Sequence, residues 1–305
     1  MAHIRIATRS SQLAIAQAEA VAAVLQKEGH TTELVPIETQ GDQVLDRQLH
    51  EIGRKGIFTQ ELETALLTNQ VDLAVHSLKD LPTVLPPGLV IGAYALPEDR
   101  RDVLISGGDS LATLSAGACV GTSSLRRMAF LKAIRPDLRV VPVRGNVQTR
   151  LQKWSNGQAD ALVLAAAGLV RLGWSDRITE YLDPQVMVPS PGQGVLAIEI
   201  ASHRDDVKPL MQRLNDSNSQ VLAQAERAVL AEMGSNCQLP LGAYAQWVGP
   251  GRLELTAQVS DVQGQEVLQQ TIQCNAQQAS ASGHALGRAL LERGALRLIK
   301  SPGGK

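Results

Sequence analysis

The chain begins with the segment HIRIATRSSQLAIAQAEAVAAVLQKEGHTTELVPI at residues 3–37, in which the spacing of the apolar residues changes twice. Residues 3–8 have the pattern of a strand. Ser10 or Ser11 can then cap a helix that runs to Gly29, with apolar residues recurring at helical spacing at Leu13, Ala16, Ala20, Val24 and Leu25. Residues 32–37 supply another strand. The segment therefore predicts a strand, a helix and a second strand, the start of an α/β fold.

The same alternation continues along the chain. A helical pattern at 60–68 precedes a continuous apolar run at 71–75, which is typical of a buried parallel strand. After a polar stretch at 97–102, strands are expected at 119–120, 138–143 and 161–164, each followed by a helical pattern. We predict two α/β lobes built on parallel sheets. TRSS at 8–11 and TSSLRR at 122–127 occupy like places, which hints at a duplicated architecture.

The character of the sequence changes near residue 217. A helix to about residue 233 is followed by three alternating strands, with turn signals at 249–251 and 263–264. A last helix is expected from about 277 to 293. This part predicts a small α+β third domain.

Composition excludes several classes of protein. The 305 residues are 44% apolar and carry 29 Lys and Arg against 30 Asp and Glu, so generic nucleic-acid binding and intrinsic disorder are both disfavoured. Aromatic residues make up only 3%, too few for a platform that stacks nucleobases. The longest apolar stretch, 161–170, is shorter than the roughly 20 residues of a membrane helix. With no signal-peptide pattern at the start, we expect a cytoplasmic protein with no membrane or nucleic-acid partner.

The three cysteines, Cys119, Cys237 and Cys274, are widely spaced and form no Cys-x-x-Cys motif. Neither a disulfide scaffold nor a metal site is expected. Cys237 lies in the turn-rich segment GSNCQLPLG at 234–242, where a thiol is either exposed and nucleophilic or simply a small buried group. Cys119 and Cys274 fall in strands and are interpreted as structural.

Arginines recur where predicted strands end or helices begin. In open α/β sheets these places line the ligand crevice, and several guanidinium groups there suit a ligand with many carboxylates. The alternative is that they are ordinary surface arginines paired with nearby acids. The residues concerned are Arg9, Arg126, Arg127, Arg144, Arg150 and Arg171.

Two further segments are candidates for function. In HSLKDLP at 76–82, Pro82 keeps the preceding residue extended, so Lys79 and Asp80 should be presented at the carboxyl edge of the sheet. They form either a catalytic acid and base or a structural pair at a turn. Residues 41–58 mix Gly, Asp, Arg and Lys, and form either a lid with contact residues Arg54, Lys55 and Phe58 or a solvated connection.

Taken together, these segments resemble the porphobilinogen deaminase family, also called the hydroxymethylbilane synthases. The resemblance runs in order along nearly the whole chain, through the motifs IATR at 6–9, AVHSLKDLP at 74–82, GTSSLRR at 121–127, RGNVQTRL at 144–151, PGQG at 191–194 and CQLPLG at 237–242.

The resemblance implies two lobes like those of periplasmic anion-binding proteins and a third domain that carries a cofactor loop. The chain would cross between the lobes near Pro97 and Pro189. Lobe one is then expected at 1–96 with 194–214, lobe two at 97–193 and the C-terminal domain at 215–305.

The resemblance also implies a reaction. A dipyrromethane primer is attached through a thioether to the loop cysteine, which corresponds to Cys237. Four porphobilinogen molecules are added in turn, each losing ammonia to give an electrophilic azafulvene, and hydrolysis releases the linear tetrapyrrole hydroxymethylbilane. Because each pyrrole carries an acetate and a propionate, the resemblance explains the arginines. The implied partner is porphobilinogen alone, bound by a monomer.

Site residues carry over by their place in the motifs. The primer is expected to contact Cys237, Lys79, Asp80, Thr122, Ser124, Arg126, Arg127 and Arg150. Incoming substrate is expected at Arg9, Ser11, Gln17, Arg144 and Arg171. Asp80 corresponds to the family's catalytic aspartate, which can stabilise the cationic azafulvene and relay a proton to the departing ammonia.

The chain departs from the family pattern at four positions. Ser235 and Asn236 replace the usual Gly-Gly pair before the cysteine, which puts the efficiency of primer attachment in question. Glu51 stands where lysine is frequent in the lid, and Arg100 where proline is common near the crossing.

Two other functions compete with this one. A non-catalytic two-lobed receptor for a polycarboxylate would use the same arginines but has no purpose for the cysteine loop. A Cys–His hydrolase built on Cys237 and His76 leaves the arginines unexplained.

Overall fold

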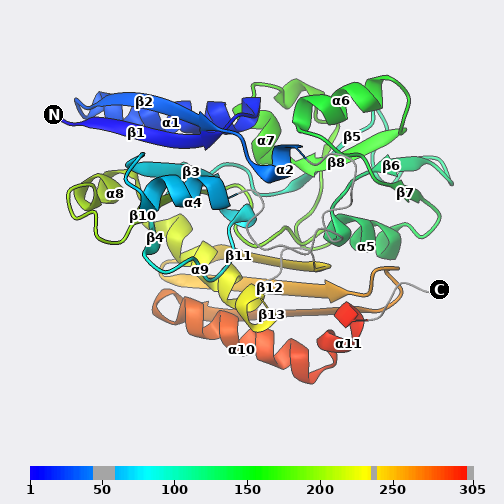
Figure 1. Ribbon diagram of the computed structural model, residues 1–305. Coiled ribbons are helices and arrows are strands. Elements are labelled where there is room, and N and C mark those ends of the chain that lie inside the picture. Colours follow the sequence, from blue (N-terminus) through cyan, green and yellow to red (C-terminus); the bar gives the residue numbers. More distant parts are fainter. Residues whose placement is uncertain (44–58, 235–238, 301–305) are drawn as a thin grey trace. The chain divides into compact units, whose positions relative to one another are not determined.

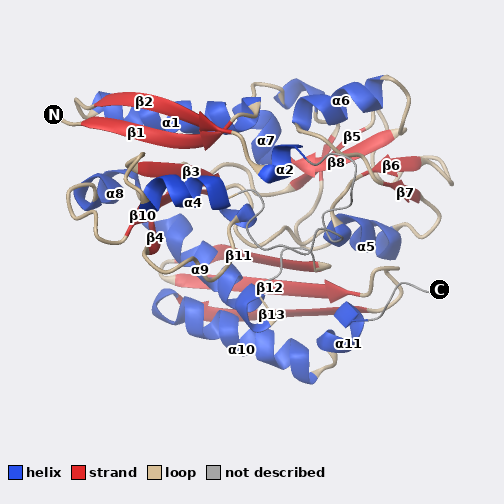
Figure 2. Cartoon of the chain, viewed as in Figure 1, coloured by secondary structure: helices blue, strands red, loops and turns tan. Residues whose placement is uncertain are grey.

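The computed structural model describes residues 1–43, 59–234 and 239–300 (Figure 1). Helices and strands alternate through most of this length and form three sheets, so the expected α/β class is confirmed (Figure 2). The chain divides into two compact units, unit one with residues 1–98 and 194–220, and unit two with residues 99–193 and 221–305. In the described ranges, no helix is both long enough and apolar enough to span a membrane.

Unit one is built on a five-stranded sheet of order β2-β1-β3-β10-β4. The first three strands are parallel, whereas β10 runs antiparallel to both β3 and β4. The strands are β1 His3–Arg9, β2 Thr31–Ile37, β3 Leu73–Ser77, β4 Leu89–Ala95 and β10 Leu196–Ala201. Helices α1 Gln12–Lys27 and α8 Lys208–Leu214 pack on one face, α4 Gln60–Leu67 packs on the other, and α2 is Gln40–Gln43.

The start of α1 follows the prediction from sequence. Ser11 is the N-cap, and its hydroxyl accepts a hydrogen bond from the Ala14 amide at 3.3 Å. Gly29 follows the end of the helix with a φ of +86°, a conformation that favours glycine. The prediction of a parallel sheet was only partly right, because β10 is antiparallel. A mostly apolar segment such as residues 196–201 indicates a buried strand but carries no information about its direction.

The first sheet of unit two has the order β7-β6-β8-β5-β9. Its strands are β5 Asp102–Ile105, β6 Cys119–Gly121, β7 Arg139–Val141, β8 Ala161–Ala165 and β9 Glu180–Tyr181. Its helices are α5 Leu125–Ile134, α6 Val147–Ser155 and α7 Ala166–Arg171. Strands β6, β7 and β8 are parallel, and β5 is antiparallel to β8 and β9. This is the strand arrangement of unit one, so the duplicated architecture is confirmed.

Unit two also contains the C-terminal sheet, β11-β12-β13, with strands Leu241–Gly249, Arg252–Ser260 and Val267–Asn275. Helices α9 Ser217–Glu232, α10 Ala279–Glu292 and α11 Ala295–Lys300 share its apolar core (Figure 1). Gly283 lets α10 approach α9, because a Cβ there would lie 2.2 Å from the Ala225 carbonyl oxygen. The α+β character predicted for this part is confirmed, while the boundaries of three separate domains stay a prediction.

The turn between β12 and β13 packs against helix α5. A Cβ on Gly264 would lie 2.5 Å from the Ala129 carbonyl oxygen, and Lys132 donates a hydrogen bond to Gln263 Oε1 at 2.7 Å. The C-terminal sheet therefore contacts α5, the helix whose first turn contains Arg126 and Arg127.

Candidate active site

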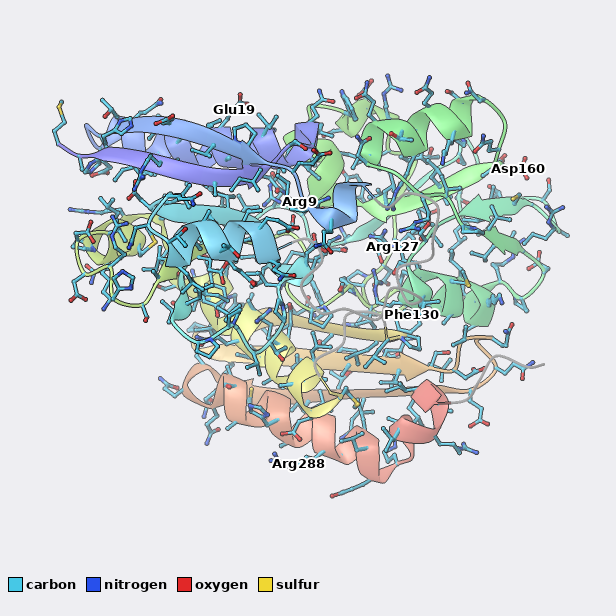
Figure 3. The ribbon with its side chains drawn as sticks, in the orientation of Figure 1. Arg9, Glu19, Arg127, Phe130, Asp160 and Arg288 are labelled. Atoms are coloured by element: carbon cyan, nitrogen blue, oxygen red, sulfur yellow. The ribbon has the colours of Figure 1, made fainter. Side chains whose placement is uncertain are left out.

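In unit one, candidate residues gather at the carboxyl ends of β1 and β3. These strands are parallel neighbours, so Arg9 at the end of β1 and Ser77 at the end of β3 lie at one edge of the sheet. Figure 3 labels Arg9. Gln17, in the second turn of α1, is buried and donates a hydrogen bond to Ser77 Oγ at 3.1 Å. The structure thus brings Arg9, Ser11 and Gln17 to the strand that leads to Lys79 and Asp80.

The segment after β3 is anchored on both sides of those two residues. It forms a 3₁₀ turn, Leu78–Asp80, in which the Leu78 amide donates to the Val195 carbonyl at 3.0 Å. Leu78 and Leu81 are buried, and Leu81 is extended as predicted from Pro82. Between these anchors Lys79 is half-buried and Asp80 is exposed. Asp80 is therefore held by its neighbours in the chain and presented to solvent.

His76 faces the opposite side of β3 and is buried. Its Nε2 lies 3.0 Å from Glu199 Oε2, an ion-pair distance, although the two groups are not aligned for a hydrogen bond. Burial raises the pKa of the neighbouring Glu63, and a hydrogen bond from Thr59 partly opposes this shift. His76 is only 5% exposed and is therefore not presented to a substrate, so this placement argues against the Cys–His hydrolase.

In unit two, a loop after β6 positions the start of α5. The Thr122 amide donates to the Val141 carbonyl at 2.9 Å, and the Ser124 amide donates to Thr122 Oγ1 at 3.3 Å. Ser124 is the N-cap of α5, and its hydroxyl accepts from the Arg127 amide at 3.4 Å. These bonds place Arg126 and Arg127 in the first turn of the helix, and Figure 3 labels Arg127 there and Phe130 one turn later.

Arg126 and Arg127 converge on Asp102, the first residue of β5. Arg126 Nη1 donates to Asp102 Oδ2 at 2.7 Å and to the Val188 carbonyl at 2.8 Å. Arg127 donates from Nε and Nη2 to Asp102 Oδ1, at 3.0 and 2.8 Å. Asp102 is 0% exposed and both arginines are buried. The interpretation of these two as ordinary surface arginines is therefore wrong, although each does pair with an acid.

Gln193 completes this cluster, which we call the Asp102 cluster (Asp102, Arg126, Arg127 and Gln193). The Gln193 amide donates to Asp102 Oδ1 and to the Arg100 carbonyl, both at 2.9 Å, and its Oε1 accepts from Arg127 Nη2 at 3.3 Å. Sequence reasoning missed Asp102 and Gln193 as site residues. Asp102 was placed in the polar stretch 97–102, and the signal that could have found it is an acid directly before the apolar run at 103–105.

The cluster carries one net positive charge, because two guanidinium groups share one carboxylate. Burial acts to raise the pKa of Asp102, but the two guanidinium groups outweigh it and hold that pKa well below its ordinary value. Within the described residues, Arg126 Nε and Nη2 donate no hydrogen bond. The cluster therefore has both the charge and the free donors to bind a carboxylate.

The remaining arginine candidates of unit two are half-buried. Arg144 follows β7, and its carbonyl accepts from Lys153 Nζ at 3.1 Å. Arg150 lies in the first turns of α6 and donates from Nε to the Gly145 carbonyl at 2.7 Å. Arg171 ends α7. Arg144 thus follows a strand of the first sheet of unit two, while Arg150 and Arg171 lie in helices that follow its strands.

Several predicted residues lie outside the described ranges, namely the lid residues Arg54, Lys55 and Phe58, the cysteine Cys237, and the departures Glu51, Ser235 and Asn236. Among the residues that are described, no three His, Cys, Asp or Glu side chains are grouped so that they could hold a metal ion.

Comparison with known proteins identifies related sequences. Residues 4–209 match the family model "Porphobilinogen deaminase, dipyromethane cofactor binding domain", and residues 221–292 match "Porphobilinogen deaminase, C-terminal domain". The porphobilinogen deaminase of Syntrophomonas wolfei is 43% identical over 98% of both chains. That of Chromobacterium violaceum is 46% identical over 98% of this chain and 97% of its own. Among solved structures, the methionine binding protein MetQ covers 77% of this chain and 96% of its own at 15% identity, with a TM-score of 0.44.

Proposed function

The chain belongs to the porphobilinogen deaminase family, and from this premise we propose how its residues divide the work of the reaction. It is a transferase that condenses four porphobilinogen molecules on a bound dipyrromethane and releases hydroxymethylbilane by hydrolysis. The comparisons do not favour the non-catalytic receptor.

The Asp102 cluster fits a group that carries carboxylates. Dipyrromethane has an acetate and a propionate on each ring, so an anion with several carboxylates must be matched by fixed cations. The net positive charge of the cluster and the unfilled donors of Arg126 supply such a match in a buried setting, where charge-assisted hydrogen bonds are strong. When bound, dipyrromethane supplies the nucleophilic α-carbon of its terminal pyrrole.

We assign the primer to Lys79, Asp80, Thr122, Ser124, Arg126, Arg127 and Arg150, with its thioether on Cys237. Incoming substrate is assigned to Arg9, Ser11, Gln17, Arg144 and Arg171, and the lid to Arg54, Lys55 and Phe58. These assignments rest on the motifs, and for the described residues they are supported by the places at the strand ends and helix starts of each unit.

Asp80 is the proposed catalytic residue. Loss of ammonia from porphobilinogen breaks a C–N bond and leaves a cationic azafulvene, and attack by a pyrrole α-carbon forms the new C–C bond and releases a proton. A carboxylate presented to solvent on an anchored turn can accept the pyrrole N–H and stabilise the developing positive charge. The fixed backbone of Leu78 and Leu81 keeps that carboxylate in position.

A single observation carries the proposal, namely two buried guanidinium groups that share one carboxylate. The experiment is an intact mass measurement combined with an assay of ammonia release from porphobilinogen. The wild type should show a mass excess of two pyrrole units, and Cys237→Ala should lose both that excess and the activity. An active wild type without the mass excess would overturn the primer mechanism. His76→Ala should keep the activity, whereas a Cys–His hydrolase would lose it.

We further propose that the protein works in the cytoplasm as a monomer whose only partner is porphobilinogen, without nucleic acid. The near-zero net charge of -1 and the scarcity of aromatic residues support the absence of a nucleic-acid partner.

A further inference from the structure

We propose that Asp102 is a positioning residue that acts as an internal counter-charge, holding Arg126 and Arg127 ready for the primer before the primer is present. This inference rests on the proposed function. It adds a residue that none of the motifs quoted from the sequence contains.

The geometry shows how Asp102 can position both arginines. Its two oxygens are divided between them, Oδ2 to Arg126 and Oδ1 to Arg127. Among the residues that the structure describes, Arg126 donates hydrogen bonds only through Nη1, which leaves Nε and Nη2 as the donor pair for an incoming carboxylate. Gln193 fixes the carboxylate in turn by donating to Oδ1 at 2.9 Å. Asp102 therefore sets which edge of Arg126 is presented.

The duplicated fold shows that a buried acid is not required at this place. Asp102 is the first residue of β5 and pairs with Ala165, the last residue of β8. In unit one the corresponding strand is β10, whose first residue, Leu196, pairs with Ser77 at the end of β3. The same architecture thus accepts a leucine. Because buried ion pairs are often no more stabilising than apolar residues, Asp102 is better explained by function than by fold stability.

The primer-free protein should depend on the charge of Asp102 for its stability. Without Asp102, two buried guanidinium groups would face each other with no counter-charge, and the cost of desolvating both charges would be uncompensated. The carboxylates of a bound primer can replace part of that lost negative charge. Loss of the Asp102 charge should therefore destabilise the primer-free protein more than the primer-loaded protein.

The test is a cycle of four proteins in which Asp102→Asn is combined with Cys237→Ala, which removes the primer. We expect Asp102→Asn to lower Tm by roughly 10 °C in the Cys237→Ala background and by less than half of that in the loaded protein. The loaded state of each sample is checked by intact mass. Asp137→Asn is the matched control, because it breaks a partly exposed ion pair with Arg135 in the same unit. It should lower Tm by the same small amount in both backgrounds.

Equal losses of Tm with and without primer would mean that Asp102 is only structural, and would overturn the proposal. If Asp102→Asn carries no primer, the loaded and primer-free forms cannot be compared, and a further variant tests the proposal instead. Adding Arg126→Gln to Asp102→Asn in the Cys237→Ala background restores the original net charge, so Tm should recover by at least half of the loss. No recovery would also overturn the proposal. A wild type that carries no primer would instead contradict the proposed function, so the two failures are distinguishable.

Discussion

At the scale of single residues, the site is made of side chains whose chemistry depends on what surrounds them. Asp80 follows β3 and is exposed on a turn, whereas Asp102 begins β5 and is buried between two guanidinium groups. Asp80 is accessible to a substrate, whereas Asp102 is enclosed by its two partners. This difference in environment supports the proposed catalytic role for Asp80 and the proposed positioning role for Asp102.

Asp80→Asn should fold normally but lose activity. The side chain is exposed, so we expect its removal to change Tm by no more than about 2 °C, whereas loss of the stabilising charge should lower turnover by about 100-fold or more. Ammonia release under saturating porphobilinogen measures the effect. Asp205→Asn, an exposed acid of unit one, is the control and should keep full turnover. Near-normal turnover of Asp80→Asn would remove Asp80 from the catalytic role.

Glu63 predicts that the stability of the protein depends on pH. Burial raises its pKa in the folded protein above the unfolded value, so the folded state binds the proton more tightly. The stability that Glu63 contributes is then full below the unfolded pKa and is lost as pH rises through the folded pKa. Glu63→Gln should therefore gain free energy of unfolding relative to the wild type as pH increases from about 4 to 8. Urea melts across that range measure it, with the exposed Glu19→Gln as the control. A difference that does not change with pH would contradict the shift.

At the scale of helices and strands, much of the fold could be predicted because local signals were strong. The cap at Ser11 and the end at Gly29 agree with the structure, whereas of the apolar positions named for α1 only Leu25 is buried. The other buried apolar residues of the helix are Ala14, Ala18, Val21 and Ala22. Strands β5 and β10 were harder, because each runs antiparallel among parallel neighbours and its direction is decided by where the chain returns. The Asp102 cluster was missed for the same reason, since its members come from 102, 126–127 and 193 and meet only in three dimensions.

Arg100 contacts an element far away in the sequence. Its Nη1 donates to Glu226 Oε1 of α9 at 2.8 Å. Glu226 also accepts from the Gly192 and Ala245 amides, both at 2.8 Å. Arg100 therefore helps to hold α9 and β11 beside the segment that contains Gly192.

The turn between β12 and β13 offers a test at this scale. Gly264 and Gly251 both have a positive φ in a hairpin turn, but only Gly264 is packed against backbone atoms, those of α5. Alanine at either position should cost about 1–2 kcal/mol for the backbone conformation, and Gly264→Ala should cost about 1–3 kcal/mol more for the clash. Chemical denaturation of both variants gives the difference. Equal losses of the free energy of unfolding in the two variants would show that the turn does not pack against α5.

At the scale of the whole molecule, unit one is assembled from two separate stretches of sequence. Asp72 joins them, because it accepts hydrogen bonds from Arg5 of β1 at 2.8 to 3.1 Å and from Arg204, beyond β10, at 2.9 Å. Burial acts to raise the pKa of Asp72, but the hydrogen bonds from Arg5 and Arg204 outweigh it and lower that pKa. The carboxylate of Asp72 therefore links the two stretches of sequence, 1–98 and 194–220, that form unit one.

This contact predicts acid sensitivity. A carboxyl group with a lowered folded pKa contributes stability that is present above the unfolded pKa and is lost as pH falls through the folded pKa. Asp72→Asn should thus reduce the free energy of unfolding by about 2–4 kcal/mol at pH 7 and by much less at pH 2 to 3. Asp206→Asn, which removes the exposed partner of the same Arg204, should cost under about 1 kcal/mol. If the free energies of unfolding of the wild type and Asp72→Asn differed by the same amount at every pH, the prediction would be contradicted.

The position of β10 between β3 and β4 has a consequence for synthesis on the ribosome. Strand β4 pairs only with β10 in this sheet, so it has no hydrogen-bonding neighbour until residues 196–201 have left the exit tunnel. By then every strand of the β7-β6-β8-β5-β9 sheet has already been translated. The part of the nascent chain that emerges first is therefore the part whose sheet is completed later.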